Sequence, residues 1–104
     1  MKLMTKEIEK RLEKSPLYSK DGQGEDAEVI VKFFNPTGKG TWLVLEGEKI
    51  EDNDWEFFGM VEFDSWEYGY FRLSELENVK LPFGLKIERD LYMSKNSTVK
   101  DCIN

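Results

Sequence analysis

Histidine is absent from this sequence of 104 residues, cysteine occurs once, as Cys102, and proline occurs three times. These absences exclude zinc sites built from cysteine and histidine, Ser-His-Asp and Cys-His catalytic centres, and a disulfide within the chain. No run of apolar residues approaches the length of a membrane-spanning helix, so we expect none. The first residues lack the apolar segment of a signal peptide, so we expect no such peptide.

Hydrophobic residues make up 39% of the sequence and aromatic residues 13%, which favours a folded protein over a disordered one. A chain of this length buries about two thirds of its unfolded surface, enough for a core without metal or disulfides. We therefore predict a single domain over residues 1–104. Its ordered core should cover about residues 3–93, and the mostly polar residues 94–104 should form a flexible tail.

Apolar periodicity predicts a short amphipathic helix near the N-terminus. Met4, Ile8 and Leu12 recur every four residues after Thr5, which is a good N-cap. These residues give one narrow apolar stripe on a helix over about 5–14. A Ser-Pro pair ends it, because the residue before a proline is pushed out of the helical region.

Apolar runs separated by turn sequences predict about five strands. The continuous run Trp42–Leu45 is typical of a strand that is covered on both faces. The capping box over 74–77 predicts a short helix over about 75–80, before the last strand. This order predicts an α+β fold with a mostly antiparallel sheet, an N-terminal helix and a short helix before the last strand. The strands are expected at about 27–34, 42–45, 55–63, 66–73 and 85–92.

Two residues within the expected strands are unusual there. Gly69 predicts a bulge or a point of close packing. Arg89 falls in the apolar row of Leu85, Ile87 and Leu91. It predicts an edge position, a guanidinium lying over an aromatic ring, or a buried ion pair that fixes the last strand.

The net charge of −6 is concentrated in the middle of the chain, where residues 41–70 hold nine acids and one base. Such a segment repels nucleic-acid phosphates and attracts basic protein surfaces. It is either a solvated hairpin face that keeps the protein soluble or a docking face for a basic partner.

The aromatic residues are too numerous for one face of a five-stranded sheet. Phe34 and Phe58 fall on strand rows that also hold Lys32 and Glu56. A partly exposed apolar row flanked by charge is typical of interfaces, although a loop or the N-terminal helix could cover it. The acidic neighbours do not suit a nucleic-acid stacking platform. The candidate partner-binding residues are acids and rings of the central segment: Glu46, Glu48, Glu51, Asp52, Asp54, Glu56, Phe58, Glu62, Asp64, Trp66 and Glu67.

Other patterns carry little chemistry. Gly22–Gly24 precedes a strand, whereas a phosphate-binding loop follows a strand and opens a helix, so a turn is expected. The acids of 21–26 and 52–54 could hold a weak calcium ion, but neither segment has the frame of an EF-hand loop. Paired carboxylates can perform acid–base chemistry, but a small sheet offers little depth for a cleft. We predict no catalytic residue, no cofactor and no metal.

Short sequence segments that occur together in a fixed order give a family resemblance. They are Leu3–Ile8, Pro16–Ser19, Gly22–Gly24, Val31–Pro36, Phe57–Gly59, Gly69–Leu76 and Ile87–Tyr92. Together they resemble a family of small bacterial proteins catalogued as domain of unknown function 2958, over about residues 3–93. The chain departs from that pattern after Met93 and at Trp42–Val44, where a second aromatic is expected. The resemblance implies a cytoplasmic protein encoded by a plasmid, phage or conjugative element, and no catalytic residues.

These observations favour a non-catalytic acidic binding protein that docks on a basic surface of a host or element protein. Because defence nucleases have positively charged DNA channels, they also predict an anti-defence inhibitor of the anti-CRISPR or anti-restriction type that mimics phosphate. The alternatives are a small carboxylate- or metal-dependent enzyme acting on nucleic acid or glycan, and a self-assembling accessory subunit whose aromatic row is the dimer face. We expect a protein partner, no direct contact with nucleic acid and no membrane; the sequence does not set the oligomeric state.

Overall fold

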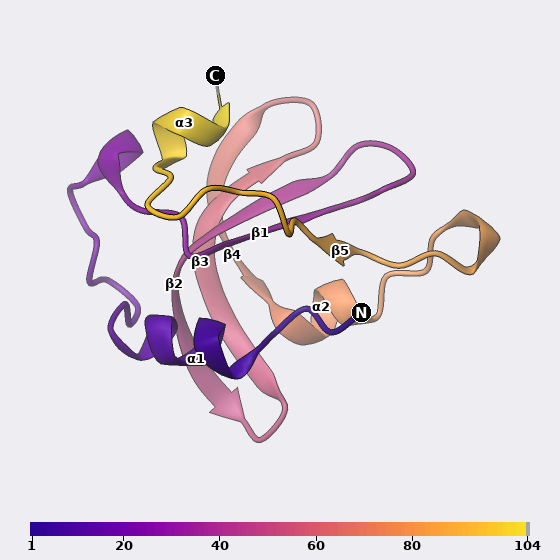
Figure 1. The fold of residues 1–104 in the computed structure, drawn as a ribbon, viewed down its shortest axis with the longest axis horizontal. Helices are drawn as coiled ribbons and strands as arrows, with labels where there is room; N and C mark the ends of the chain where they lie inside the picture. The colour runs from indigo at the N-terminus through magenta and orange to yellow at the C-terminus, as the bar shows by residue number, and fades with distance from the viewer. Residues whose placement is uncertain (104) are drawn as a thin grey trace.

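The computed structural model describes residues 1–103 and shows a five-stranded antiparallel sheet in the order β4-β3-β2-β1-β5 (Figure 1). The predicted α+β fold is confirmed. The elements are α1 (Lys6–Glu13), the 3-10 turn η1 (Gly24–Asp26), β1 (Val31–Phe34), β2 (Thr41–Glu51), β3 (Asp54–Glu62), β4 (Trp66–Arg72), α2 (Leu73–Glu77), the turn η2 (Pro82–Gly84), β5 (Glu88–Arg89) and α3 (Val99–Ile103). Among the described residues, no helix has the length and apolar character that a membrane crossing requires.

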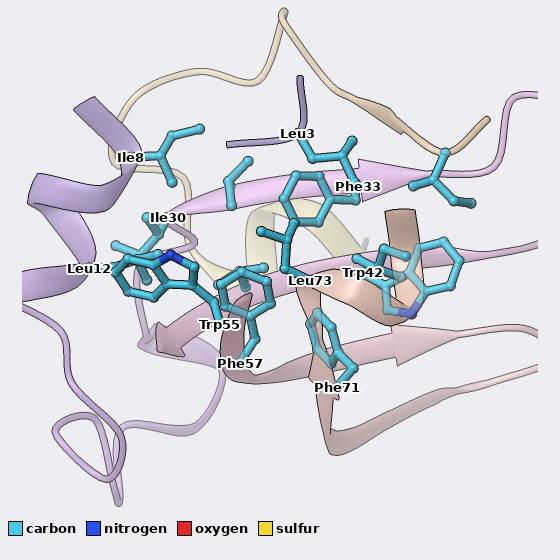
Figure 2. Close-up of a cluster of buried hydrophobic side chains, with 14 residues drawn as sticks. Leu3, Ile8, Leu12, Ile30, Phe33, Trp42, Trp55, Phe57, Phe71 and Leu73 are labelled. Atoms are coloured by element: carbon cyan, nitrogen blue, oxygen red, sulfur yellow. The ribbon is translucent and has the colours of Figure 1, made fainter. Parts of the chain in front are cut away.

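One face of the sheet, which we call the helix face, packs against α1, α2 and the N-terminal segment. The predicted N-cap of α1 is confirmed, because the Thr5 hydroxyl accepts a 3.1 Å hydrogen bond from the backbone N–H of Ile8. Figure 2 shows Ile8 and Leu12 pointing from α1 into the cluster that also holds the rings of Trp55 and Phe57. Leu12 and Phe57 are fully buried there, so the apolar stripe read from the sequence is the contact of α1 with the sheet.

The opposite face, which we call the ring face, carries a second and smaller core. Its buried members are Ala27, Val29, Leu43, Leu45, Met60 and Val99. Leu43 and Leu45 point to this face while Trp42 and Val44 belong to the helix face, so the run Trp42–Leu45 is covered on both sides as predicted.

The C-terminal residues, expected to form a flexible tail, instead complete this second core. Val99 is fully buried, and its N–H donates to the Ala27 carbonyl at 3.0 Å. The N–H of Val29 donates to the Ser97 carbonyl at 2.8 Å. In Figure 1, α3 lies at the top of the view, at the far end from α1. The sequence-based prediction was misled by the mostly polar composition of this segment, which one buried side chain, Val99, anchors to the core.

A β-bulge in β2 decides which way one carboxylate points. Val44 pairs with Gly59 on β3, but Glu46 pairs with the next residue, Phe58, so Leu45 is the extra residue of a bulge. With a regular alternation, Glu46 would follow Val44 into the apolar core of the helix face. The bulge turns it to the ring face instead, where the backbone N–H groups of Tyr18 and Lys20 donate to it.

Three details of the sheet differ from the sequence-based prediction. The short helix α2 begins at Leu73, with Arg72 as its N-cap, because the Glu75 carboxylate accepts from the Arg72 N–H at 2.9 Å. The capping box expected between Ser74 and Glu77 does not form. The register of β4 runs through Gly69 without a bulge, and a Cβ added at this glycine would meet nothing within 4 Å. The point of close packing is instead its cross-strand neighbour Gly59, where an added Cβ would lie 1.7 Å from the Leu43 carbonyl oxygen.

The edge strand β5 is much shorter than expected. The predicted edge position of Arg89 is confirmed, because β5 is the last strand of the sheet. Among the described residues, its guanidinium neither stacks on a ring nor forms a buried ion pair; it donates to the backbone carbonyls of Lys2 and Leu3. This contact ties the last strand to the N-terminal segment, so the side chain has a structural role that its place in an apolar row did not reveal.

Candidate functional site

Four aromatic side chains gather on the ring face, and we call them the ring patch: Tyr18, Phe58, Tyr68 and Tyr70. The register of β3 and β4 sets Phe58 opposite Tyr70 and Met60 opposite Tyr68, so these side chains share one face. The Phe58 and Tyr68 rings are stacked at 5.8 Å, and the Tyr70 ring lies 5.0 Å from Phe58. Tyr68 and Tyr70 are nonetheless 49% and 52% exposed. The patch is therefore ordered by ring–ring contacts and open to a partner.

Tyr18 joins the patch from the loop that follows α1. Its backbone lies in the left-handed region, with φ of 72°, which is unfavourable for a residue with a large side chain. Two contacts hold it there: its N–H donates to Glu46 Oε1 at 2.8 Å, and its hydroxyl shares a hydrogen bond with that of Tyr70. A strained, 65% exposed tyrosine fixed at both ends is typical of a functional surface.

Glu46 is the anchor of this loop. Its carboxylate, only 2% exposed, accepts from the Tyr18 N–H and, at 2.7 Å, from the Lys20 N–H. Backbone N–H groups satisfy a buried carboxylate well, because a charge-assisted hydrogen bond is stronger than a neutral one. Glu46 therefore shapes the site from beneath and does not present its charge to a partner.

Hydrogen bonding and burial shift two pKa values beside the patch. The hydrogen bond with Tyr18, partial burial, and the carboxylates of Glu46 and Asp21 raise the pKa of Tyr70 to about 12. Burial lowers the pKa of Lys20, against the opposing effect of Glu28 and Glu46. The Lys20 ammonium donates to the Glu28 carbonyl at 2.7 Å, so it is engaged within the protein.

Of the hollows on the described surface, one adjoins the ring patch and another is larger. A groove of about 320 Å³ adjoins the ring patch, between the 20–24 loop and the Phe58 and Tyr68 rings, with Glu46 and Leu45 in its lining. A larger hollow of about 660 Å³ lies beside β1, β5 and the hairpin that follows β1. In the larger one, Lys32 and Asp90 form an ion pair at 3.6 Å and so neutralise each other.

An acidic pair continues the ring face beyond the patch, and we call it the acidic row: Glu48 and Glu56. These residues lie directly opposite each other on β2 and β3, one row beyond Glu46 and Phe58. Like charges in opposite positions of a sheet repel. Arg72, opposite Glu56 on β4, offsets part of this charge at 3.6 Å, while Glu48 is exposed. This row is the acidic element that accompanies the exposed rings.

The model of one protein family, described as "Protein of unknown function (DUF2958)", matches residues 3–103. The chain belongs to the DUF2958 family. No curated protein and no solved structure matches it. The DUF2958 match extends past Met93 and includes α3, so the expected departure from the family pattern in the tail is wrong.

The other predicted partner-binding residues of this DUF2958 protein do not form one surface. Half-buried Glu62 and Trp66 lie opposite each other on the ring face, and Trp66 packs on the second core. Exposed Glu67 lies opposite Val61 and so belongs to the helix face. The remaining four occur at the hairpin ends: Glu51, Asp52, Asp54 and Asp64. The negative charge of residues 41–70 is thus divided among both faces and two turns.

Two of these four have structural partners. The Asp54 carboxylate accepts from the Ser74 N–H and hydroxyl and from the Trp55 N–H, at 2.8–2.9 Å. Burial acts to raise its pKa, but these hydrogen bonds outweigh that effect and lower it. Asp64 pairs with Lys39 across the turns. Asp54 joins β3 to α2, so its role in this structure is to hold the fold.

Sequence reasoning missed Tyr18, Tyr68 and Tyr70 as members of the site. The alternation of β3 and β4 across a three-residue turn could have placed Tyr68 and Tyr70 beside Phe58. No sequence signal places Tyr18 there, because its position depends on the bulge and on buried Glu46. Among residues 1–103, no three acidic or cysteine side chains are grouped to hold a metal ion.

Proposed function

We propose that this chain is a non-catalytic binding protein that docks on a basic surface of another protein through the ring patch and the acidic row. The observation that carries the proposal is that the half-exposed Tyr68 and Tyr70 rings lie next to carboxylates on the same sheet face. Tyrosine is enriched at interface hot spots, since it buries a large area and loses little conformational freedom. Rings beside carboxylates suit arginine and lysine, whose cations bind both groups.

The cost of the arrangement supports a binding role. Glu48 opposite Glu56 and a left-handed Tyr18 both reduce the stability of the free protein. A basic partner would relieve the repulsion, and a rigid patch loses little entropy on binding. Features that are unfavourable for folding and clustered on one surface are expected where function requires them.

The test is capture of a protein from a bacterial host lysate on immobilised protein, at low and at high salt. We expect capture at low salt, its weakening at high salt, and its loss with Glu48→Lys and with Tyr68→Ala/Tyr70→Ala. Glu67→Lys makes the same charge change on the helix face and should leave capture intact. Equal capture by Glu48→Lys, the tyrosine variant and wild type would overturn the proposal.

The class of partner remains a prediction from the family resemblance. If the chain is encoded by a mobile element, a defence nuclease with a positively charged DNA channel is the basic protein that it would gain most from blocking. An anti-CRISPR or anti-restriction role predicts that the purified protein slows DNA cleavage by such a nuclease. Glu48→Lys should remove that inhibition, and inhibition unaffected by this change would rule out docking through the acidic row.

A further inference from the structure

The edge strand β4 is open along its outer side. It is the first strand of the order β4-β3-β2-β1-β5, and its ladder with β3 is regular over all seven residues. Apart from that ladder, no backbone hydrogen bond within residues 1–103 reaches Trp66–Tyr70. The other edge, β5, has only two residues.

Natural sheets protect such an edge with proline, lysine, a bulge or a covering segment, because free N–H and C=O groups would otherwise pair with another strand. β4 contains neither proline nor lysine, and its register has no bulge; its charged residues are Glu67, on the helix face, and Arg72, the last residue of the strand. An edge of this length with so little protection is suited to strand addition.

The sequence of β4 is close to symmetric about Gly69. If a second copy pairs antiparallel with Gly69 opposite Gly69, then Tyr68 faces Tyr70 of the second copy and Trp66 faces Arg72 of the second copy. All four side chains lie on the ring face. Aromatic cross-strand pairs and an arginine over an indole are both favourable, and the twofold axis makes each of these pairs twice.

We propose that two copies of this chain pair through their β4 edges, about an axis at Gly69, into one continuous antiparallel sheet. The twofold arrangement satisfies the edges of both copies with the same contacts, which a strand of unrelated sequence would not do. It sets the two ring patches side by side on one face, and it does not require the proposed function.

Cysteine cross-linking tests the axis, in a Cys102→Ser background that removes the native thiol. Directly opposite residues of antiparallel strands have Cα atoms about 4.5–5.5 Å apart, within the range of a disulfide. An added Cβ at Gly69 meets nothing within 4 Å, so Gly69→Cys should fold and form a covalent dimer on mild oxidation. Glu67→Cys is the control, because its counterpart would lie roughly 14 Å away along the strand. Equal cross-linking by both variants, or none by Gly69→Cys, would overturn this register.

Sedimentation velocity over a range of concentrations tests the pairing without any cross-link. We expect wild type to dimerise and Gly69→Lys, which would oppose two ammonium groups at the axis, to remain monomeric with an unchanged circular dichroism spectrum. A wild-type monomer at every concentration would overturn the proposal and leave the edge to a strand of another protein. Loss of the dimer with capture of a basic partner intact would separate this surface from the docking surface.

Discussion

The buried carboxylate of Glu46 accepts a 2.7 Å hydrogen bond from the backbone N–H of Lys20, which lies 26 residues earlier in the chain. Together with the bond from Tyr18, this contact fixes the loop after α1 against β2. The ring patch depends on it, since Tyr18 would otherwise leave its unfavourable backbone conformation. Stability and the binding surface are thus joined at one side chain.

Replacing Glu46 should therefore be costly. In Glu46→Gln only one oxygen can accept, so one of two buried N–H groups loses its partner, and we expect a loss of about 1.5–3 kcal/mol in the free energy of unfolding. Urea denaturation measures it. Glu48→Gln, exposed two residues further along β2, is the matched control and should change stability by less than about 0.5 kcal/mol. Similar losses in both variants would contradict the anchoring role.

Gly59 and Gly69 offer a matched pair of substitutions, because they lie opposite each other on β3 and β4. A Cβ added at Gly59 would lie 1.7 Å from the Leu43 carbonyl oxygen, whereas one at Gly69 meets open space. We expect Gly59→Ala to lose at least about 3 kcal/mol, and Gly69→Ala to stay within about 0.5 kcal/mol of wild type. Thermal and urea unfolding at low protein concentration measure both. A well-folded Gly59→Ala would show that the strands separate more easily than the structure implies.

The hydroxyl of Tyr70 should lose its proton at a higher pH than an ordinary tyrosine. Its pKa of about 12 in the folded protein lies above the value near 10 expected for an unfolded chain. A raised pKa contributes stability that is fully present below about pH 10 and is lost as the pH rises through about 12. Absorbance at high pH should show a late phase that Tyr70→Phe lacks and that Tyr18→Phe shifts to lower pH. A late phase that persists in Tyr70→Phe would assign it to another tyrosine.

The C-terminal segment should contribute to stability. Val99 is fully buried in the second core, so Val99→Ala should cost about 1–3 kcal/mol of unfolding free energy. Lys100→Ala, exposed on the same helix, is the control. An unfolding curve of Val99→Ala that overlays wild type would restore the original expectation of a flexible tail.

Local patterns predicted the parts of the fold whose causes are local. The spacing of Met4, Ile8 and Leu12 placed α1, and the run Trp42–Leu45 identified a strand covered on both sides. The bulge at Leu45 could not be predicted, because a continuous apolar run has no alternation to mark an extra residue. The edge position of Arg89 was predicted, but its partners were not, because Lys2 and Leu3 lie at the other end of the chain.

The site was less predictable than the fold. Net charge along the sequence does not tell which face a carboxylate occupies, and the acids of residues 41–70 divide between two faces and the turns. Glu46 and Asp54 look like surface acids in the sequence, yet one is buried under a loop and the other joins β3 to α2. Phe58 was identified from its strand row, but the residues that complete its patch come together only through the register of β4 and the path of the loop.

The order in which this protein assembles follows from how its strands are connected. β2, β3 and β4 follow one another along the chain as a meander, so their ladders need only short loops to close. The hydrogen bond from the Arg89 guanidinium to the Lys2 carbonyl, in contrast, joins residues 87 positions apart in the chain. Amide hydrogens that bond within the β2–β3 and β3–β4 ladders should thus be protected longest from exchange with deuterium. Those of β5 and the N-terminal segment should exchange first.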